Sequence, residues 1–315
     1  MPSTYLVPIE TKAVLGDDYP LRCDNMGLIL DRYLPLEAIR NGRDDMIFNQ
    51  NGRPIRTLRA DWLQKVTQAV SAERLQPLQQ ALIERWQLSV QGALIFEMRA
   101  RTRLIVGLGG KGALEFGITL HHTTGLPIIP GSALKGAARS YALWSIAAEQ
   151  FAAEKPEDWQ TKETLDAFND QLLTSGRVDH PDADYYRRAF GSQEVGGECV
   201  FHDALVSRLQ AGSIYAVDVM TPHFKEYYTT SGKAAPHDGD GPNPVSFLTV
   251  TAGTYFGFAV GLRHGTEDAA LMRRAAQWLA LRPAEPIERR RTHPDSVVSH
   301  AAAAQLQGLG VVTAS

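Results

Sequence analysis

The sequence has few of the residues that indicate a disulfide-stabilised, zinc-binding or membrane-spanning protein. Its 315 residues include two cysteines, Cys23 and Cys199, which cannot form a disulfide framework and match no zinc-ligand spacing. No basic segment followed by an apolar stretch indicates secretion, and no apolar run is long enough to cross a bilayer. We therefore expect a cytoplasmic protein without membrane attachment, metal or cofactor.

The chain also lacks an excess of positive charge. Its 32 Lys and Arg residues are outnumbered by 35 Asp and Glu residues, which gives a formal net charge of −3 at pH 7. Taken alone, this value argues against a free-standing nucleic-acid-binding protein. The charge is unevenly distributed, however, since residues 99–139 hold six Lys or Arg residues and a single acidic residue, Glu115. A basic segment in an acidic chain predicts contact with RNA on one face and with protein elsewhere. A chance local excess of basic residues is the alternative.

The basic segment ends in residues 125–140, GLPIIPGSALKGAARS. Pro130 and Gly131 interrupt the preceding chain, and Ser132 is a good N-cap residue. The sequence therefore predicts a helix over 133–149 that begins directly after this turn. The unpaired amides of such a helix start are suited to binding an anion.

Three polar side chains share one stripe of this predicted helix. Lys135 and Arg139 are four residues apart, and Ser132 precedes Lys135 by three. Gly131 and Gly136 keep side-chain bulk away, so that a polymer backbone can approach closely. A phosphate group would meet amides, a hydroxyl and two cations together. A well-capped helix with two solvated basic residues is the alternative.

The remaining chain alternates between helical and extended patterns. Residues 57–90 carry apolar side chains at helical spacing. Residues 94–106 alternate as a strand with one basic face, which is either solvated or faces RNA. Further expected elements are a helix-containing insertion near 153–184, strands at 198–204, 213–220, 245–251 and 254–262, a hairpin turn at Ala252–Gly253, a mobile loop near 231–243 and an amphipathic helix at 267–281.

This order of elements is compatible with a ferredoxin-like β-α-β-β-α-β core in an α+β protein. We expect residues 1–90 to form a largely helical N-terminal extension packed on the core. Residues 91–315 then form the ferredoxin-like domain, which carries the insertion and the mobile loop.

Motifs that would indicate an enzyme are incomplete. The glycines at 107, 109 and 112 match the dinucleotide fingerprint, but the chain that follows reads as extended and lacks the ribose-binding acid. The Gly-Lys pair ending at Lys111 lacks the first glycine of a P-loop and its Ser or Thr. His121 and His122 could act as acid and base on RNA, but adjacent residues of a strand point to opposite faces.

The run from 125 to 139 resembles the signature of the RAMP superfamily, the repeat-associated proteins of CRISPR effector complexes. That signature reads Gly-Leu-Pro-Tyr-Ile-Pro-Gly-Ser-Ser-Leu-Lys-Gly followed by an Arg, and here Ile128 and Ala133 replace the Tyr and the second Ser. Further patches are similar to the family formed by the sixth subunit of the type III-B CRISPR (Cmr) complex. They are residues 25–33, 104–109, 115–121, 190–192, 197–204, 218–228 and 244–250.

The resemblance implies an RRM-like RAMP core and a structural subunit without catalysis. Such a subunit would bind the 3′ side of guide RNA and the guide–target duplex, cap the row of RAMP subunits in antiviral defence, and contact neighbouring RAMP and small subunits. RAMP subunits that cleave RNA have an Asp before the signature, and none lies between Leu104 and Leu134. The alternatives are a metal-independent RAMP endoribonuclease that processes guide RNA, and a protein-interaction adaptor without RNA contact.

The candidate RNA-binding residues lie in three segments. Residues 223–228 combine a cation with aromatic rings that can stack on bases, although those rings can equally be core. The family usually ends with a Gly-x-Gly-x-Lys-Thr loop, of which residues 282–315 keep only a glycine pair. No RNA contact is therefore assigned to this segment. The candidates are Lys111, His122, Gly131, Ser132, Lys135, Gly136, Arg139, His223, Lys225 and Tyr227.

Overall fold

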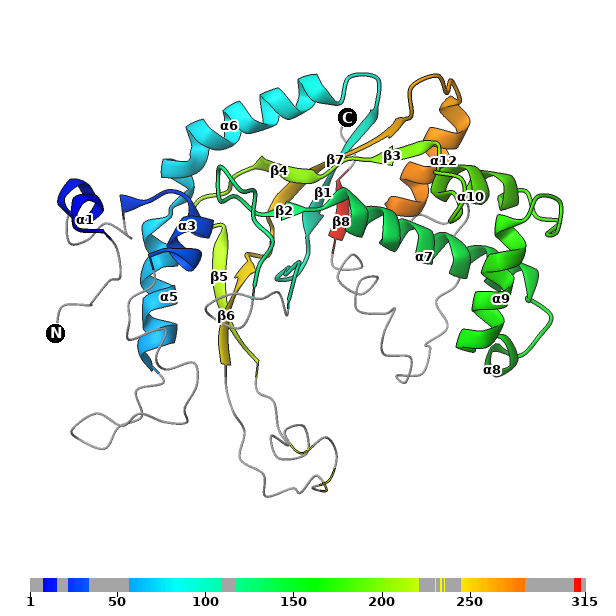
Figure 1. Cartoon of the computed structure of the whole chain (residues 1–315), viewed down its shortest axis with the longest axis horizontal. Coiled ribbons are helices and arrows are strands. Elements are labelled where there is room, and N and C mark those ends of the chain that lie inside the picture. The colour runs from blue at the N-terminus through cyan, green and yellow to red at the C-terminus, as the bar shows by residue number, and fades with distance from the viewer. Residues whose placement is uncertain are drawn as a thin grey trace. The chain divides into compact units, whose positions relative to one another are not determined.

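The chain divides into two compact units, each formed by three segments. In the computed structural model (Figure 1), the described residues are 8–15, 22–33, 57–108, 117–220, 230, 233, 235, 245–280 and 309–312. The first unit comprises Met1–Gln79, Arg103–Pro127 and Leu209–Thr254, and the second comprises Gln80–Thr102, Ile128–Arg208 and Tyr255–Ser315. Most of the predicted loop at 231–243 lies outside the described residues.

The second unit is built on a six-stranded antiparallel sheet. Its strands are β1 (Leu94–Ala100), β2 (Ile128–Ile129), β3 (Cys199–Phe201), β4 (Ala204–Arg208), β7 (Tyr255–Leu262) and β8 (Leu309–Val312), in the order β2-β4-β7-β1-β8 with β3 also paired to β7. The main helices are α7 (Gly131–Gln150) and α12 (Ala269–Leu279). Along the chain, β1, α7, β3–β4, β7, α12 and β8 follow the order β-α-β-β-α-β. The predicted α+β class is confirmed, and this order is consistent with a ferredoxin-like core.

Strand β7 is central because β1 and β4 both pair with it at Gly257, on opposite edges. Phe256, Phe258, Ala259 and Val260 are fully buried. The Phe258 ring stacks on Phe96 of β1, with ring centroids 5.5 Å apart. The alternation predicted for the first residues of 94–106 is confirmed, since Met98 and Ala100 are buried and Arg99 is exposed.

Helices α7, α10 (Ala183–Phe190) and α12 pack on one face of this sheet. The Phe190 ring of α10 contacts both Phe201 of β3 and Trp278 of α12, with ring centroids 5.9 and 5.6 Å away. The insertion predicted near 153–184 contains α8 (Pro156–Trp159) and α9 (Lys162–Leu173). Trp159 packs against Trp144 of α7 at 5.8 Å between ring centroids. These contacts anchor the insertion to α7.

The end of α6 (Ala72–Ser89) covers the opposite face of β7. Trp86 and the following Val90 form a buried cluster with Leu205 and Ala259. A Cβ on Gly257 would lie 3.3 Å from the Trp86 ring, so the absence of a side chain at this position admits the ring. The Trp86 indole donates a hydrogen bond of 3.0 Å to the carbonyl of Asp203.

The first unit contains a two-stranded antiparallel sheet of β5 (Tyr215–Met220) and β6 (Val245–Val250). Helix α5 (Thr57–Ala69) packs on both strands. The remaining helices are α1 (Ile9–Leu15), α3 (Met26–Asp31) and the start of α6. Helices α5 and α6 confirm the helical prediction for 57–90, with a short interruption between them.

Two sequence predictions about strands are wrong. The chain at 245–262 is not a hairpin, because β6 pairs with β5 and β7 pairs with β1, β3 and β4. The nearly continuous apolar run of β7 needs burial on both faces, which the larger sheet provides. The strand predicted at 198–204 is broken into β3 and β4 at His202–Asp203, where Asp203 turns toward α7.

Candidate nucleic-acid interface

Helix α7 begins two residues before the predicted start, and the prediction that Ser132 is its N-cap is wrong. The cap position is Pro130, which has no side chain to accept a hydrogen bond. Asp203 takes this role from outside the helix, since its Oδ1 accepts a hydrogen bond of 2.7 Å from the Gly131 amide. Ser132 lies exposed in the first turn.

This carboxylate changes what the start of α7 offers to an anion. A negative group is favourable at the positive end of a helix, and Asp203 already supplies one. Among the described residues, the amides of Ser132 and Ala133 still lack an acceptor. A phosphate in front of the helix would therefore share the position with a carboxylate, so the nearby cations must supply most of its attraction.

The two glycines of the signature have different surroundings. Gly131 is buried, and a Cβ there would overlap the carbonyl oxygen of Phe201 in β3. The prediction that Gly131 admits a polymer backbone is wrong, because the backbone of β3 occupies that space. Gly136 is exposed, and a Cβ there would meet nothing within 4 Å. An approach of RNA at Gly136 stays a prediction.

Lys135 and Arg139 lie half-buried on α7, as the shared stripe predicts. Burial lowers the pKa of Lys135, and the positive charges of Arg139 and Arg263 lower it further. No carboxylate pairs with Lys135, Arg139 or Arg263 in the part of the chain that the structure describes. Lys135 is therefore repelled by both arginines, and no carboxylate of the described residues pairs with it.

Arg139 is held by neutral groups. Its Nε donates to the Tyr186 hydroxyl at 3.2 Å, and its Nη2 donates to Asn169 Oδ1 at 3.2 Å. The Tyr186 hydroxyl in turn donates to Asn169 Oδ1 at 2.7 Å. These bonds orient the guanidinium but leave its charge uncompensated.

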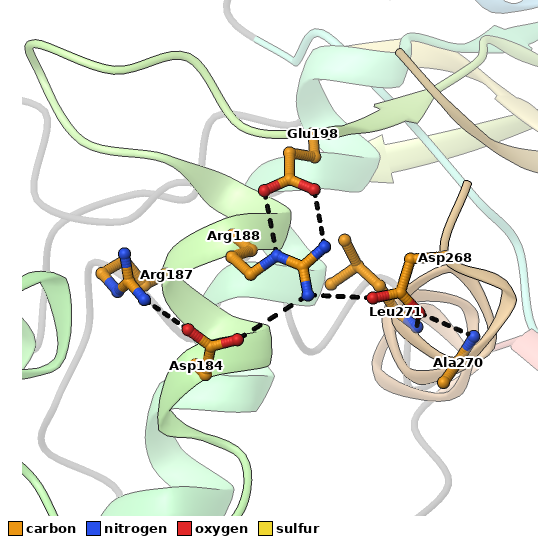
Figure 2. A network of polar contacts seen from close by, with 7 residues as sticks. All are labelled: Asp184, Arg187, Arg188, Glu198, Asp268, Ala270 and Leu271. Atoms are coloured by element: carbon orange, nitrogen blue, oxygen red, sulfur yellow. Dashed lines mark hydrogen bonds and ion pairs between the residues drawn. The ribbon is translucent and has the colours of Figure 1, made fainter. Parts of the chain in front are cut away.

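Several other arginines of the second unit pair with acids, and three of them show the contrast with Arg139. Figure 2 shows the Arg188 guanidinium between Glu198 and Asp268, with Nε and Nη2 at 2.9 and 2.8 Å from Glu198 and Nη1 at 2.9 Å from Asp268. Arg274 pairs with Asp182. Similarly, Arg208 pairs with Glu97. Arg139 differs from these arginines in having neutral partners only, which makes it a candidate for binding an external anion.

His122 belongs to the first unit, at the exposed tip of a well-supported turn. Asn25 Nδ2 donates to the carbonyls of His122 and Thr123 at 3.2 and 3.1 Å, and its Oδ1 caps α3 by accepting from the Leu28 amide at 3.0 Å. Gly125 closes the turn with a φ of +69°, and a Cβ there would overlap the backbone at Asn25. The turn thus requires both Asn25 and a glycine at 125.

Replacing Asn25 with alanine is expected to lower local stability by about 1 kcal/mol, because α3 loses its cap and the turn loses its support. Amide hydrogen exchange should accelerate at residues 122–125 and at the start of α3. Exchange in β7 serves as the internal control and should not change. Unaltered exchange at the turn would contradict the role given to Asn25.

Four predicted RNA-binding residues, Lys111, His223, Lys225 and Tyr227, lie outside the described residues. His121 is described, and its Nδ1 lies 3.2 and 3.1 Å from the hydroxyls of Thr123 and Thr124. The part of the chain that is described contains no group of His, Cys, Asp and Glu side chains suited to a metal ion. None of its helices is long and apolar enough to cross a membrane.

Sequence reasoning missed four residues of this interface. They are Asn169, Tyr186, Asp203 and Arg263, which follow Arg139 in the chain by 30 to 124 positions. No local motif marks them. Only the fold brings their elements to α7. A partial signal existed for Tyr186, which lies in the Tyr-Tyr-Arg-Arg run at 185–188.

Comparison with known families decides the affiliation of the chain. The family profile described as the RAMP superfamily matches residues 97–270, which include the end of β1, all of α7 and β7, and the start of α12. The chain belongs to the RAMP superfamily. The matched span contains the cations of α7 together with Asn169, Tyr186 and Arg263.

Two curated relatives of this RAMP protein carry the name of one subunit. It is 32% identical over 199 residues to the CRISPR system Cmr subunit Cmr6 of Pyrococcus furiosus, over 54% of this chain and 58% of the relative. It is 27% identical over 168 residues to the Cmr6 of Saccharolobus solfataricus, over 52% of this chain and 44% of the relative. The match therefore spans about half the length of these relatives.

Solved structures give weaker similarity. A cryo-EM structure of the type III-B Cmr-beta complex bound to cognate target RNA contains a chain that matches with a TM-score of 0.43 and 20% identity, over 70% of this RAMP protein and 66% of that chain. The crystal structure of Cmr6 from Pyrococcus furiosus matches with a TM-score of 0.36 and 28% identity, over 60% of this chain and 88% of the other.

Proposed function

We propose that this RAMP protein is a non-catalytic, RNA-binding structural subunit of a cytoplasmic type III-B CRISPR (Cmr) ribonucleoprotein. Its similarity to the two Cmr6 proteins supports the assignment to this complex. The observation that carries RNA binding is the pair Lys135 and Arg139, two half-buried cations on α7 without a carboxylate partner among the described residues. A polyanion would supply the missing counter-charge.

In this role the protein binds the 3′ side of the guide RNA and the guide–target duplex and caps the row of RAMP subunits during antiviral defence. Its partners are guide RNA, target RNA and the neighbouring RAMP and small subunits. Pairing between guide and target reads the sequence, so the protein needs only contacts to phosphates and 2′-hydroxyls. We further propose that residues 1–90 serve as an extension of the RAMP domain formed by 91–315.

Catalysis is not part of this proposal. The chain has no Asp between Leu104 and Leu134, the region where RNA-cleaving RAMP subunits carry one. Incubation of the purified protein with repeat RNA in EDTA should leave the RNA intact. Cleavage that depends on His121 or His122 would favour the endoribonuclease alternative and contradict our proposal.

The double substitution Lys135→Ala with Arg139→Ala is expected to weaken RNA binding about tenfold at moderate salt, because two phosphate contacts are lost. The slope of log affinity against log salt concentration should become shallower by about 1.4, since each single-strand contact contributes about 0.7. Filter binding of guide RNA to the full-length protein over a KCl series measures both quantities.

The matched control is Arg177→Ala with Arg273→Ala, which removes the same charge from exposed residues of the same unit. This control should leave the affinity and the salt slope near their wild-type values. An equal effect of the two double variants would show that only net charge matters. An absence of RNA crosslinks to the chain in the assembled complex would instead favour a protein-interaction adaptor.

A further inference from the structure

We infer that Arg263 joins Lys135 and Arg139 in a three-cation site for the phosphodiester backbone of RNA, and that Tyr186 and Asn169 are positioning residues that orient Arg139 in this site. This inference rests on the proposed RNA-binding function. It adds one binding residue and two supporting residues that lie outside the sequence signature.

The backbone holds Arg263 at the end of β7, beside β3. Leu262 pairs with Cys199 in the sheet, and the Arg263 amide donates to the carbonyl of Glu198 at 2.7 Å. The guanidinium lies over Gly196, where a Cβ would be only 2.7 Å from Nη2 and 2.9 Å from Nη1. The missing side chain at Gly196 therefore makes room for the Arg263 guanidinium.

Glu198, whose backbone carbonyl accepts from the Arg263 amide, does not neutralise Arg263. Both carboxylate oxygens of Glu198 accept hydrogen bonds from Arg188 (Figure 2). Among the described residues, Arg263 has no carboxylate partner of its own. Helix α7 packs against β3, and β3 pairs with the end of β7 directly before Arg263, so the fold places Arg263 next to the strand on which α7 lies. In keeping with this placement, the charge of Arg263 contributes to the lowered pKa of Lys135. Lys135 thus feels both arginines, and Glu198, the acid next to β3, is already paired with Arg188.

The support of Arg139 has the properties that an anion site needs. Tyr186 is fully buried, and burial raises the pKa of its hydroxyl, so the hydroxyl stays protonated and donates to Asn169. Asn169 and Tyr186 come from α9 and α10, and together they accept two of the five guanidinium N–H groups of Arg139. The remaining three donors are available to phosphate oxygens, whose geometry a guanidinium matches.

RNA fits this set of groups better than a single small anion does. The three cations come from two different elements, α7 and the residue after β7, and they carry no base-specific acceptor. Such a set attracts a chain of phosphates regardless of its sequence. An acidic surface of a neighbouring protein subunit would satisfy the same cations, and the experiment below separates the two ligands.

The first test compares Arg263→Ala with Arg273→Ala in the full-length protein. Arg273 is an exposed arginine of α12 that we place outside the site. The probe is a fluorescein-labelled single-stranded RNA of mixed sequence, measured by anisotropy over a KCl series. Arg263→Ala should lower the affinity about fivefold and make the salt slope shallower by about 0.7, whereas Arg273→Ala should change neither.

The second test uses Tyr186→Phe, which keeps the buried ring, and Asn169→Ala as an independent variant. Each should weaken RNA binding about threefold, as expected for one lost hydrogen bond. The salt slope should stay at the wild-type value, because the charge of Arg139 is retained. In an Arg139→Ala background neither change should weaken binding further, since both residues act through Arg139.

The outcomes separate this inference from the proposed function. Unchanged RNA binding by the Lys135→Ala, Arg139→Ala variant overturns both. If that variant binds weakly but Arg263→Ala and Arg273→Ala have the same RNA affinity and salt slope, the three-cation site is wrong and the proposed function stands. If Tyr186→Phe still weakens RNA binding in the Arg139→Ala background, Tyr186 does not act by orienting Arg139, and its positioning role is overturned. Normal RNA affinity of Arg263→Ala with impaired assembly into the complex would assign Arg263 to an acidic protein partner and overturn the RNA site.

Discussion

Gly131→Ala is expected to destabilise the second unit by about 3 kcal/mol, because the new methyl group would overlap the carbonyl of Phe201 and force α7 away from β3. The obstacle is backbone, which cannot rotate aside as a flexible side chain can. A displaced α7 also loses the hydrogen bond from the Gly131 amide to Asp203. Denaturant unfolding monitored through the tryptophans measures the change.

Gly136→Ala is the matched control for this substitution. Here the added methyl group meets nothing within 4 Å, and alanine favours a helix over glycine by about 0.8 kcal/mol. The two substitutions make the same chemical change five positions apart and should have opposite effects on stability. A destabilised Gly136→Ala, or a Gly131→Ala variant as stable as wild type, would contradict these environments.

RNA binding gives a second readout of the same pair. If RNA approaches α7 at Gly136, as the sequence predicts, Gly136→Ala should bind RNA more weakly while unfolding at higher denaturant concentration. Higher stability with unchanged RNA affinity would show that the RNA passes elsewhere. The measurement therefore separates a glycine that serves packing from a glycine that serves ligand access.

Arg188→Ala is expected to destabilise the second unit by about 2 kcal/mol, because it removes the cation that joins Glu198 and Asp268 (Figure 2). Asp268 also caps α12 by accepting from the amides of Ala270 and Leu271 at 3.1 and 2.9 Å. The Arg188 network thus ties the start of β3 and α10 to the start of α12. Loss of the cation leaves two partly buried carboxylates to repel each other.

The neighbouring Arg187→Ala is the control, because Arg187 pairs with Asp184 only among the described residues. Ion pairs of this exposed kind contribute little, about 0 to 1 kcal/mol. Equal losses of stability for the two variants would show that the network has no special role. Equilibrium unfolding at pH 7 provides the comparison.

The same network makes stability depend on pH. Hydrogen bonds from Arg188 lower the pKa of Glu198, and hydrogen bonds from the Leu271 amide and Arg188 lower the pKa of Asp268. Because the folded state holds both carboxyls below their ordinary pKa, their contribution is complete above about pH 5 and is lost as the pH falls through the folded-state values. Arg188→Ala should flatten this acid limb of the stability profile.

The difference between predicted and observed structure at the start of α7 has a specific cause. Serine, proline and glycine preferences are local, and they located the helix start to within two residues. The acceptor that caps the helix is Asp203, which is 72 residues away. The sequence around Ser132 would be the same whether this serine or a distant carboxylate caps the helix, so local preferences cannot tell the two cases apart. The interpretation of Gly131 failed for the same reason, since its neighbour Phe201 belongs to another strand.

Local sequence patterns were enough to predict the helical and strand periods, a strand at 254–262 and the RAMP signature with Lys135 and Arg139, because these depend on residues close together in the chain. The folded chain was needed to show that β6 and β7 belong to different sheets, that Asp203 caps α7, and that Tyr186 and Asn169 hold Arg139. The physical reason is that pairing partners and counter-charges are chosen by packing between distant segments. A cation that looks free in the sequence becomes a binding candidate only when the fold shows which acids already have partners.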